Sequence, residues 1–138
     1  MTERERIALI DRLRALPTET EWFELKRNRY EPQQLGEYLS ALANAACLAG
    51  QPRGYLVFGI DDATHEVVGT DFDPYATKAK GNQDLLPWLA AGLRPNTGFE
   101  PHVVAHPGGR VVLFEVGPAN GEPVGFYGTP YIRVGASK

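Results

Sequence analysis

The sequence predicts one α+β domain with its elements in the order β-α-β-α-β-β, preceded by a helix and followed by a strand pair. Three observations support this fold class. Apolar residues recur at helical spacing in residues 3–16. Residues 22–26 alternate as a strand does and 54–60 form an apolar run, and a turn at 106–109 joins two further apolar runs into a hairpin. Such elements pack as a two-layer core around a mixed sheet.

Prolines and glycines mark the ends of the predicted helices. The helix in residues 3–16 ends at Pro17. Residues 32–49 are rich in leucine and alanine, start with a proline and end before Gly50, which predicts a buried helix. A third helix is expected in the later part of residues 75–93.

The remaining segments predict strands. The continuous apolar run at 54–60 is typical of a strand that is covered on both faces. A short returning strand is expected at 66–69, the hairpin strands at 99–106 and 110–116, and a final pair at 123–127 and 130–134. We therefore take residues 1–18 as an N-terminal helical segment and residues 19–138 as the domain.

Composition limits the classes of function. The single cysteine, Cys47, excludes an internal disulfide framework and a multi-cysteine zinc site, and its helix predicts that it is buried. No apolar run reaches the roughly 18 residues of a membrane span, and the charged N-terminus does not resemble a signal peptide, so we expect a cytoplasmic protein without membrane association. The net charge of −3 argues against nonspecific nucleic-acid binding by the whole surface but permits a local basic patch.

Acidic residues follow two strands that we expect to be parallel. Strands 22–26 and 54–60 are joined by one helix, and such a crossover places their carboxyl ends at one edge of the sheet. Glu24, Lys26 and the Asp61–Asp62 pair would lie at this edge, and Glu19 could approach it. Carboxylates gathered there would suit Mg²⁺ or Mn²⁺, with Lys26 on a phosphate oxygen. From spacing alone, solvated carboxylates and an ordinary Glu24–Lys26 surface pair are the favoured interpretation.

Several short motifs occur in a fixed order along the chain: Glu24-Leu25-Lys26, Ser40 to Ala45, Gly54 to Asp62, Val67 to Gly69 and Pro130 to Gly135. Together they resemble the Schlafen AlbA-type domain over residues 19–135, nearly the whole chain. The resemblance implies an Alba-like βαβαββ core and nucleic-acid binding. Many bacterial chains with this domain are labelled transcriptional regulators or ATP-binding proteins.

The resemblance also implies an alternative activity. In animal Schlafen proteins an acidic trio cleaves RNA, and here it corresponds to Glu19, Glu24 and Asp62, with Lys26 in support and Mg²⁺ or Mn²⁺ as the metal. The sequence departs from the family pattern where a longer loop, residues 45–53, replaces a threonine and paired glycines. No Gly-Lys-Ser or Gly-Lys-Thr phosphate loop is present, so no ATP site is recognisable.

Basic side chains and histidines supply further candidates. The expected phosphate contacts are Lys26, Arg27, Arg29, Lys78, Lys80 and Arg133. His102 and His106 share a face of one predicted strand, and we expect exposed histidines there rather than a metal pair. Asn44 is expected to have a structural role beside the Asp61–Asp62 turn.

Three functions remain open at this point. The first is a nucleic-acid-binding module, of RNA or DNA, without its own chemistry. The second is a divalent-metal endoribonuclease that uses Glu19, Glu24 and Asp62. The third is a protein-interaction or dimerisation domain, including a homodimer, that uses the N-terminal helix and the exposed sheet edges; the acidic net charge suits this third function best.

Overall fold

A computed structural model describes residues 1–16, 21–28 and 31–133 of the chain. The predicted βαβαββ order is confirmed, with the additional helix in front. The elements are α1 (Glu3–Ala15), β1 (Phe23–Lys26), α2 (Pro32–Leu48), β2 (Gly54–Phe58), α3 (Leu85–Gly92), β3 (Leu93–Arg94), β4 (Phe99–His106), β5 (Gly109–Val116), β6 (Gly125–Phe126) and β7 (Thr129–Pro130).

The central sheet has four strands in the order β1-β2-β5-β4. Strands β1 and β2 are parallel, as the single-helix crossover predicts, and Lys26 pairs with Phe58 at their carboxyl ends. The other two pairings are antiparallel, and β4 and β5 form the predicted hairpin. The sheet is therefore mixed, and the acidic ends of its two parallel strands share one edge.

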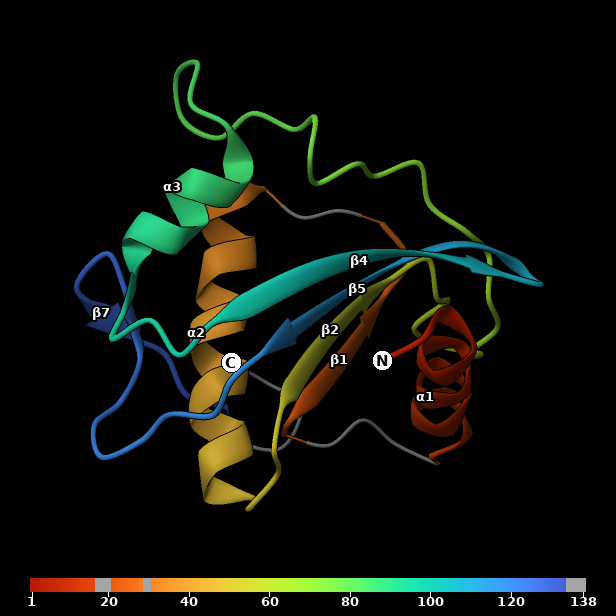
Figure 1. The fold of residues 1–138 in the computed structure, drawn as a ribbon, viewed down its shortest axis with the longest axis horizontal. Coiled ribbons are helices and arrows are strands. Elements are labelled where there is room, and N and C mark those ends of the chain that lie inside the picture. The colour runs from red at the N-terminus through yellow and green to blue at the C-terminus, as the bar shows by residue number, and fades with distance from the viewer. Residues whose placement is uncertain (17–20, 29–30, 134–138) are drawn as a thin grey trace.

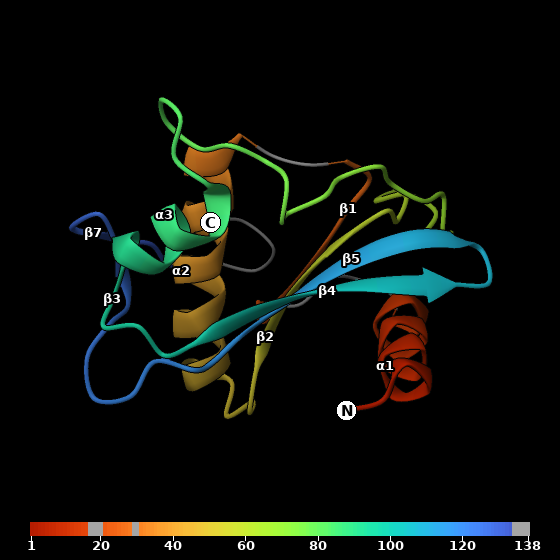
Figure 2. The same cartoon turned by 45° about the horizontal axis from the view of Figure 1, so that its top comes forward.

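Both faces of the sheet are covered by helices. Figures 1 and 2 show α1 alone on one face and α2 with α3 across the other. Leu9, Ile10 and Leu13 of α1 join the apolar cluster that contains Phe23 and Val57, whereas α2 and α3 contribute to the second cluster. Every residue of β2 is buried, which confirms the strand covered on both sides that its continuous apolar run predicts.

A small second sheet lies beyond α3. Its strands have the order β3-β6-β7, and β6 with β7 is the predicted C-terminal strand pair in a shortened form. The two-residue strand β3 is too short for its sequence to indicate it. The strand expected at 66–69 is reduced to one bridge between Ile60 and Val67.

Two polar side chains of α2 bind the segment that follows β5. The Asn44 amide donates to the Val124 and Tyr131 carbonyls at 3.0 and 2.7 Å and accepts from the Val124 N–H at 2.8 Å. Ser40 donates to the same Val124 carbonyl and accepts from the Tyr131 N–H. Asn44 thus has a structural role, but its partner is this C-terminal segment and not the Asp61–Asp62 turn that we expected.

The exposed end of α2 corrects another expectation. Cys47 is exposed, because the last turn of α2 extends past the sheet that buries the turns before it. Leu48 beside it is also exposed. In the described part of the chain, none of the helices combines the length and the apolar character that crossing a membrane requires.

The closest approach between α2 and the small sheet occurs at a glycine. A Cβ atom at Gly36 would lie 2.1 Å from Cζ of the buried Phe126 ring. Phe126 in turn packs edge-on against Trp88 of α3, with ring centroids 5.3 Å apart. The missing side chain at position 36 therefore allows the small sheet and α3 to dock on α2.

We predict that Gly36→Ala destabilises the protein by about 1–3 kcal/mol, because overpacking against Phe126 outweighs the roughly 1 kcal/mol by which alanine favours a helix. Urea unfolding followed by tryptophan fluorescence measures the change. In a Phe126→Ala background the same substitution should be neutral or stabilising by up to about 1 kcal/mol. Equal destabilisation in both backgrounds would show that the ring contact is not the cause.

Candidate functional site

The carboxyl ends of β1 and β2 bring most of the predicted acidic and basic residues to one edge. The Gly59 and Ile60 N–H groups donate to the Lys26 carbonyl at 2.8 and 3.0 Å, which holds the start of the following turn beside the end of β1. The segment between β2 and α3 then runs along this edge, as Figure 1 shows. Glu24, Lys26, Arg27 and Asp61 therefore lie in one region of the surface and the layer below it.

Glu24 is a buried partner of arginine and not the surface residue that its spacing indicated. Its Oε1 accepts from Nη2 of Arg133 at 2.7 Å, and its Oε2 lies 3.7 Å from Nζ of Lys26. Arg133 also donates to the Phe23 carbonyl at 3.2 Å, and its side chain is 0% exposed. Glu24 itself is 4% exposed. A buried ion pair in this geometry fixes the C-terminal segment against β1.

Arg133 is consequently not a surface phosphate contact, although its charge made it a candidate. The sequence reasoning also missed Tyr38 of α2. The Lys26 ammonium and the Arg133 guanidinium each lie 5.9 Å from the centre of the Tyr38 ring, a distance at which a cation is attracted to an aromatic face. Lys26 is held between this ring and Glu24, with 25% of its side chain exposed.

Asp61 organises the turn after β2. Its Oδ1 accepts from the Ala63 and Thr64 N–H groups, both at 2.9 Å, and its Oδ2 lies 2.7 Å from Nη1 of Arg27. The backbone N–H groups of Thr64 and Ala63 lower the pKa of Asp61, because they favour its ionised form. Arg27 keeps 65% of its side chain exposed. It is thus an oriented cation that remains accessible to a ligand.

Two of the three residues of the acidic trio, Glu24 and Asp62, lie within the described residues. Glu19 and Arg29 lie outside the described residues, and Asp62 is exposed next to the Asp61 turn. The surroundings of Glu24 suit a guanidinium and an ammonium, since one oxygen pairs with Arg133 and the other faces Lys26. A divalent cation at Glu24 would have to displace these two partners. The described residues therefore do not fit a metal at this edge.

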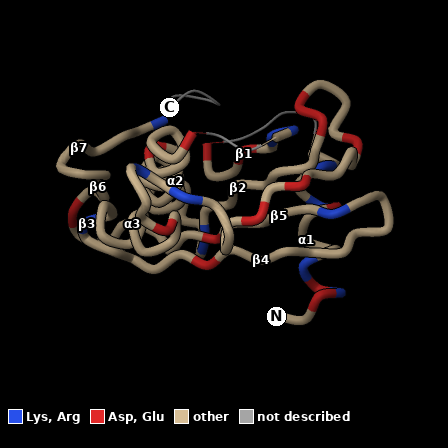
Figure 3. The backbone as a smooth tube through the Cα atoms, turned by 90° about the horizontal axis from the view of Figure 1, so that it is seen from above, with Lys and Arg blue, Asp and Glu red and all other residues tan. Residues whose placement is uncertain are grey.

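The other basic candidates belong to the segment before α3. Lys78 forms an ion pair with Asp84, and Lys80 is exposed. Figure 3 shows that the lysine and arginine positions of the described residues are scattered along the backbone among aspartate and glutamate positions. Of the described candidates, Lys26 and Arg27 are the two that the fold places side by side at the carboxyl edge of β1.

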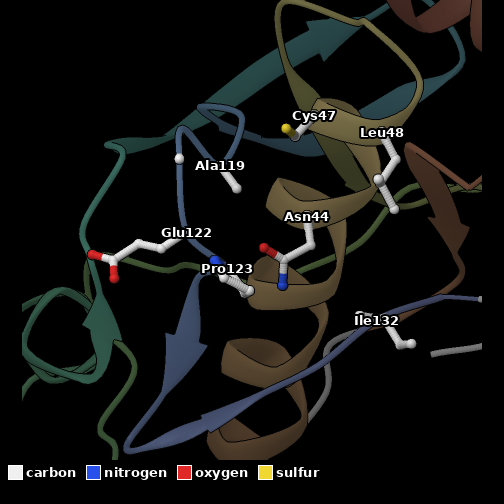
Figure 4. A pocket seen from close by; sticks show the side chains of 8 residues that line it. Asn44, Cys47, Leu48, Ala119, Glu122, Pro123 and Ile132 are labelled. Atoms are coloured by element: carbon white, nitrogen blue, oxygen red, sulfur yellow. The ribbon is translucent and has the colours of Figure 1, made fainter.

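A mainly apolar pocket of about 400 Å³ lies at the far end of α2. It lies between the last turn of α2 and the segment that follows β5, with Asn44, Cys47, Pro123 and Ile132 in its wall (Figure 4). Glu122 is the one ionisable acidic or basic side chain among its lining residues. Its described lining residues include no basic group for a phosphate, and the pocket is distinct from the edge described above.

The two histidines of β4 are largely buried, not exposed as we expected. His106 Nε2 lies 2.8 Å from Oδ1 of Asp11 on α1. This contact, together with the neighbouring Arg14, lowers the pKa of Asp11 against the opposing effect of burial. His102 faces Glu100 and Glu115 across the hairpin. Docking of α1 explains the burial, because α1 covers the face on which both histidines lie.

Comparison with known proteins adds three findings. A profile of the family described as Schlafen, AlbA_2 matches residues 19–138. The N-terminal domain of a RecG-related protein from Nitrosomonas europaea has a similar fold, with a TM-score of 0.54 and 24% identity over 96% of this chain and 90% of that domain. The DIP2311 protein from Corynebacterium diphtheriae gives a TM-score of 0.48 and 21% identity over 97% of this chain and 26% of its own length. The curated proteins contain no significant match.

We predict that Glu24→Gln lowers the free energy of unfolding by about 3–5 kcal/mol, because it leaves the Arg133 guanidinium buried without its anion. Chemical denaturation measures this loss. Asp62→Asn removes an exposed carboxylate from the same edge and should change stability by less than about 0.5 kcal/mol. A loss below about 1 kcal/mol for Glu24→Gln would contradict a desolvated ion pair.

Proposed function

The chain belongs to the Schlafen, AlbA_2 family, and we propose that it is a regulatory nucleic-acid-binding module without chemistry of its own. The observation that carries this proposal is the pair of partly exposed cations, Lys26 and Arg27, at the carboxyl end of β1. The similar domain from Nitrosomonas europaea comes from a protein described as related to an ATP-dependent DNA helicase. That description supports the nucleic-acid class of ligand.

Both cations are oriented before a ligand arrives. Glu24 and the Tyr38 ring hold Lys26, and Asp61 holds Arg27. Phosphate contacts need charge and reach, and a side chain that is already oriented loses less conformational entropy when it binds. The planar guanidinium of Arg27 can bind two phosphate oxygens at once, whereas Lys26 acts as a point charge. The edge is therefore suited to the backbone of a nucleic acid.

The state of Glu24 supports binding without cleavage. Metal-assisted hydrolysis requires carboxylates that can coordinate an ion, and the Glu24 carboxylate is engaged by Arg133 and Lys26. The same carboxylate has a clear structural use, since it ties β1 to the C-terminal segment. We therefore assign Glu24 to the support of the Lys26 side chain.

The acidic surface limits the strength of this binding. With a net charge of −3, the protein repels phosphates except where cations are concentrated. We expect a small number of phosphate contacts, and hence a modest affinity with a shallow dependence on salt. Specific recognition would then need the bases or the shape of the nucleic acid in addition to the charge.

We predict that Arg27→Ala and Lys26→Gln each weaken binding to short labelled single-stranded RNA, single-stranded DNA or duplex DNA and reduce the slope of log K against log salt by about 1. Fluorescence anisotropy across a salt series measures both quantities. Arg94→Ala is the matched control, because this exposed arginine lies on β3 of the small second sheet, away from the carboxyl end of β1. Its affinity and slope should equal those of the wild type.

Three outcomes would contradict the proposal. The first is a wild-type protein that binds none of the three probes at low salt. The second is an Arg94→Ala variant that loses as much affinity as Arg27→Ala. The third is cleavage of the RNA probe with Mn²⁺ that Asp62→Ala abolishes. Because Asp62 is exposed, this variant should fold normally, and the third outcome would favour the endoribonuclease instead.

A further inference from the structure

A histidine and two glutamates converge on the hairpin at the end of the sheet opposite Lys26. Glu100 of β4 pairs directly with Glu115 of β5, and Glu115 also pairs with Tyr55 at the start of β2. His102 follows Glu100 by two positions, so all three side chains project from the α1 face of the sheet. Within the described residues they form the one group of three metal-ligating side chains whose donor atoms lie within 4.8 Å of one another.

The histidine nitrogen in this group has no hydrogen bond. His102 Nε2 lies 3.5 Å from Oε2 of Glu100 and 3.4 Å from Oε2 of Glu115. The nitrogen is buried, and neither contact has hydrogen-bond geometry. The side chains of His102 and Glu115 are 14% and 15% exposed. A buried ring nitrogen normally has a partner, and an ion held by all three donor atoms would supply one to His102.

The spacing of the three donors matches the coordination sphere of a small divalent cation. Zinc is bound by histidine nitrogen and carboxylate oxygen at about 2.0–2.2 Å, and two ligands of a tetrahedral ion at these distances are about 3.3–3.6 Å apart. The observed separations of 3.4 and 3.5 Å fall in this range. A direct N–H···O hydrogen bond would be about 2.7–3.2 Å long instead.

We propose that Glu100, His102 and Glu115 bind a zinc ion that links β4 to β5. Two carboxylates and one neutral imidazole neutralise the charge of a divalent ion, and the mixture of nitrogen and oxygen ligands suits zinc better than magnesium or calcium. The nearby ionisable groups include Arg6, Arg53 and Tyr55. The two arginines line the same cavity as Glu100 and Glu115, and burial with the negative charge of Glu115 raises the pKa of Tyr55.

The fourth coordination position would open to solvent. Glu100 and Glu115 form part of the wall of a surface cavity of about 400 Å³, whose other lining residues include Arg6, Arg53 and Thr97. Three protein ligands with one open position are the pattern of zinc sites that hold a water or an anionic ligand. The arginines beside the cavity would favour an anion at that position.

The test is a zinc titration of the protein made without a histidine tag and stripped with a chelator. Competition with a chromophoric chelator gives the stoichiometry and affinity, and substitution with Co²⁺ gives an absorption spectrum that reports tetrahedral nitrogen and oxygen ligands. We expect one ion per chain. His102→Gln, Glu115→Gln and Glu100→Gln should each weaken zinc binding by at least about tenfold.

His106→Gln is the matched control, because it removes the other histidine from the same face of β4 and should leave zinc affinity unchanged. Glu100 is the most informative ligand variant, since its side chain is 74% exposed and its substitution should not disturb folding. The proposal is overturned if zinc binding survives Glu100→Gln and His102→Gln, if it is lost in His106→Gln, or if it fails to reach one ion per chain.

Discussion

The buried pair between Glu24 and Arg133 connects the two ends of the domain. It joins the first strand of the sheet to the segment that closes the fold, across 109 positions of sequence. Two charges that leave water are costly unless each is fully paired, so the pair strongly disfavours any arrangement that separates them. The position of α2 follows from this constraint, because the helix is enclosed between the sheet and the segment that Arg133 anchors.

Hydrogen bonds from α2 extend the same constraint. Asn44 and Ser40 bind the backbone at Val124 and Tyr131, so the segment leading to Arg133 is fixed at several points along the helix. The Phe126 ring can lie this close to α2 only where the helix has no side chain, and Gly36 is at that position. The Tyr38 ring is then brought to Lys26 and Arg133. The packing of α2 in the interior thereby decides the orientation of the Lys26 side chain.

The two proposed sites occupy opposite ends of the sheet and opposite faces. Lys26 lies on the side of α2, against Tyr38, whereas the Glu100, His102 and Glu115 group lies on the side of α1. Parallel β1 and β2 concentrate charge at one edge, and the antiparallel hairpin aligns acidic side chains at the other. A protein with a net negative charge can therefore offer both an anion-binding edge and a cation-binding group.

Local sequence patterns determined the element order and part of the strand pairing. Periodicity, turn residues and the crossover rule predicted the helices, the hairpin and the parallel β1–β2 pair, because these depend on neighbours in the sequence. Only the tertiary structure decided which charges meet. Contacts distant in the sequence bring Glu24 to Arg133, and strand register brings Glu100 to Glu115. The same alternating pattern that predicted an exposed Glu24 is compatible with burial, since the sequence of one strand does not show what covers its second face.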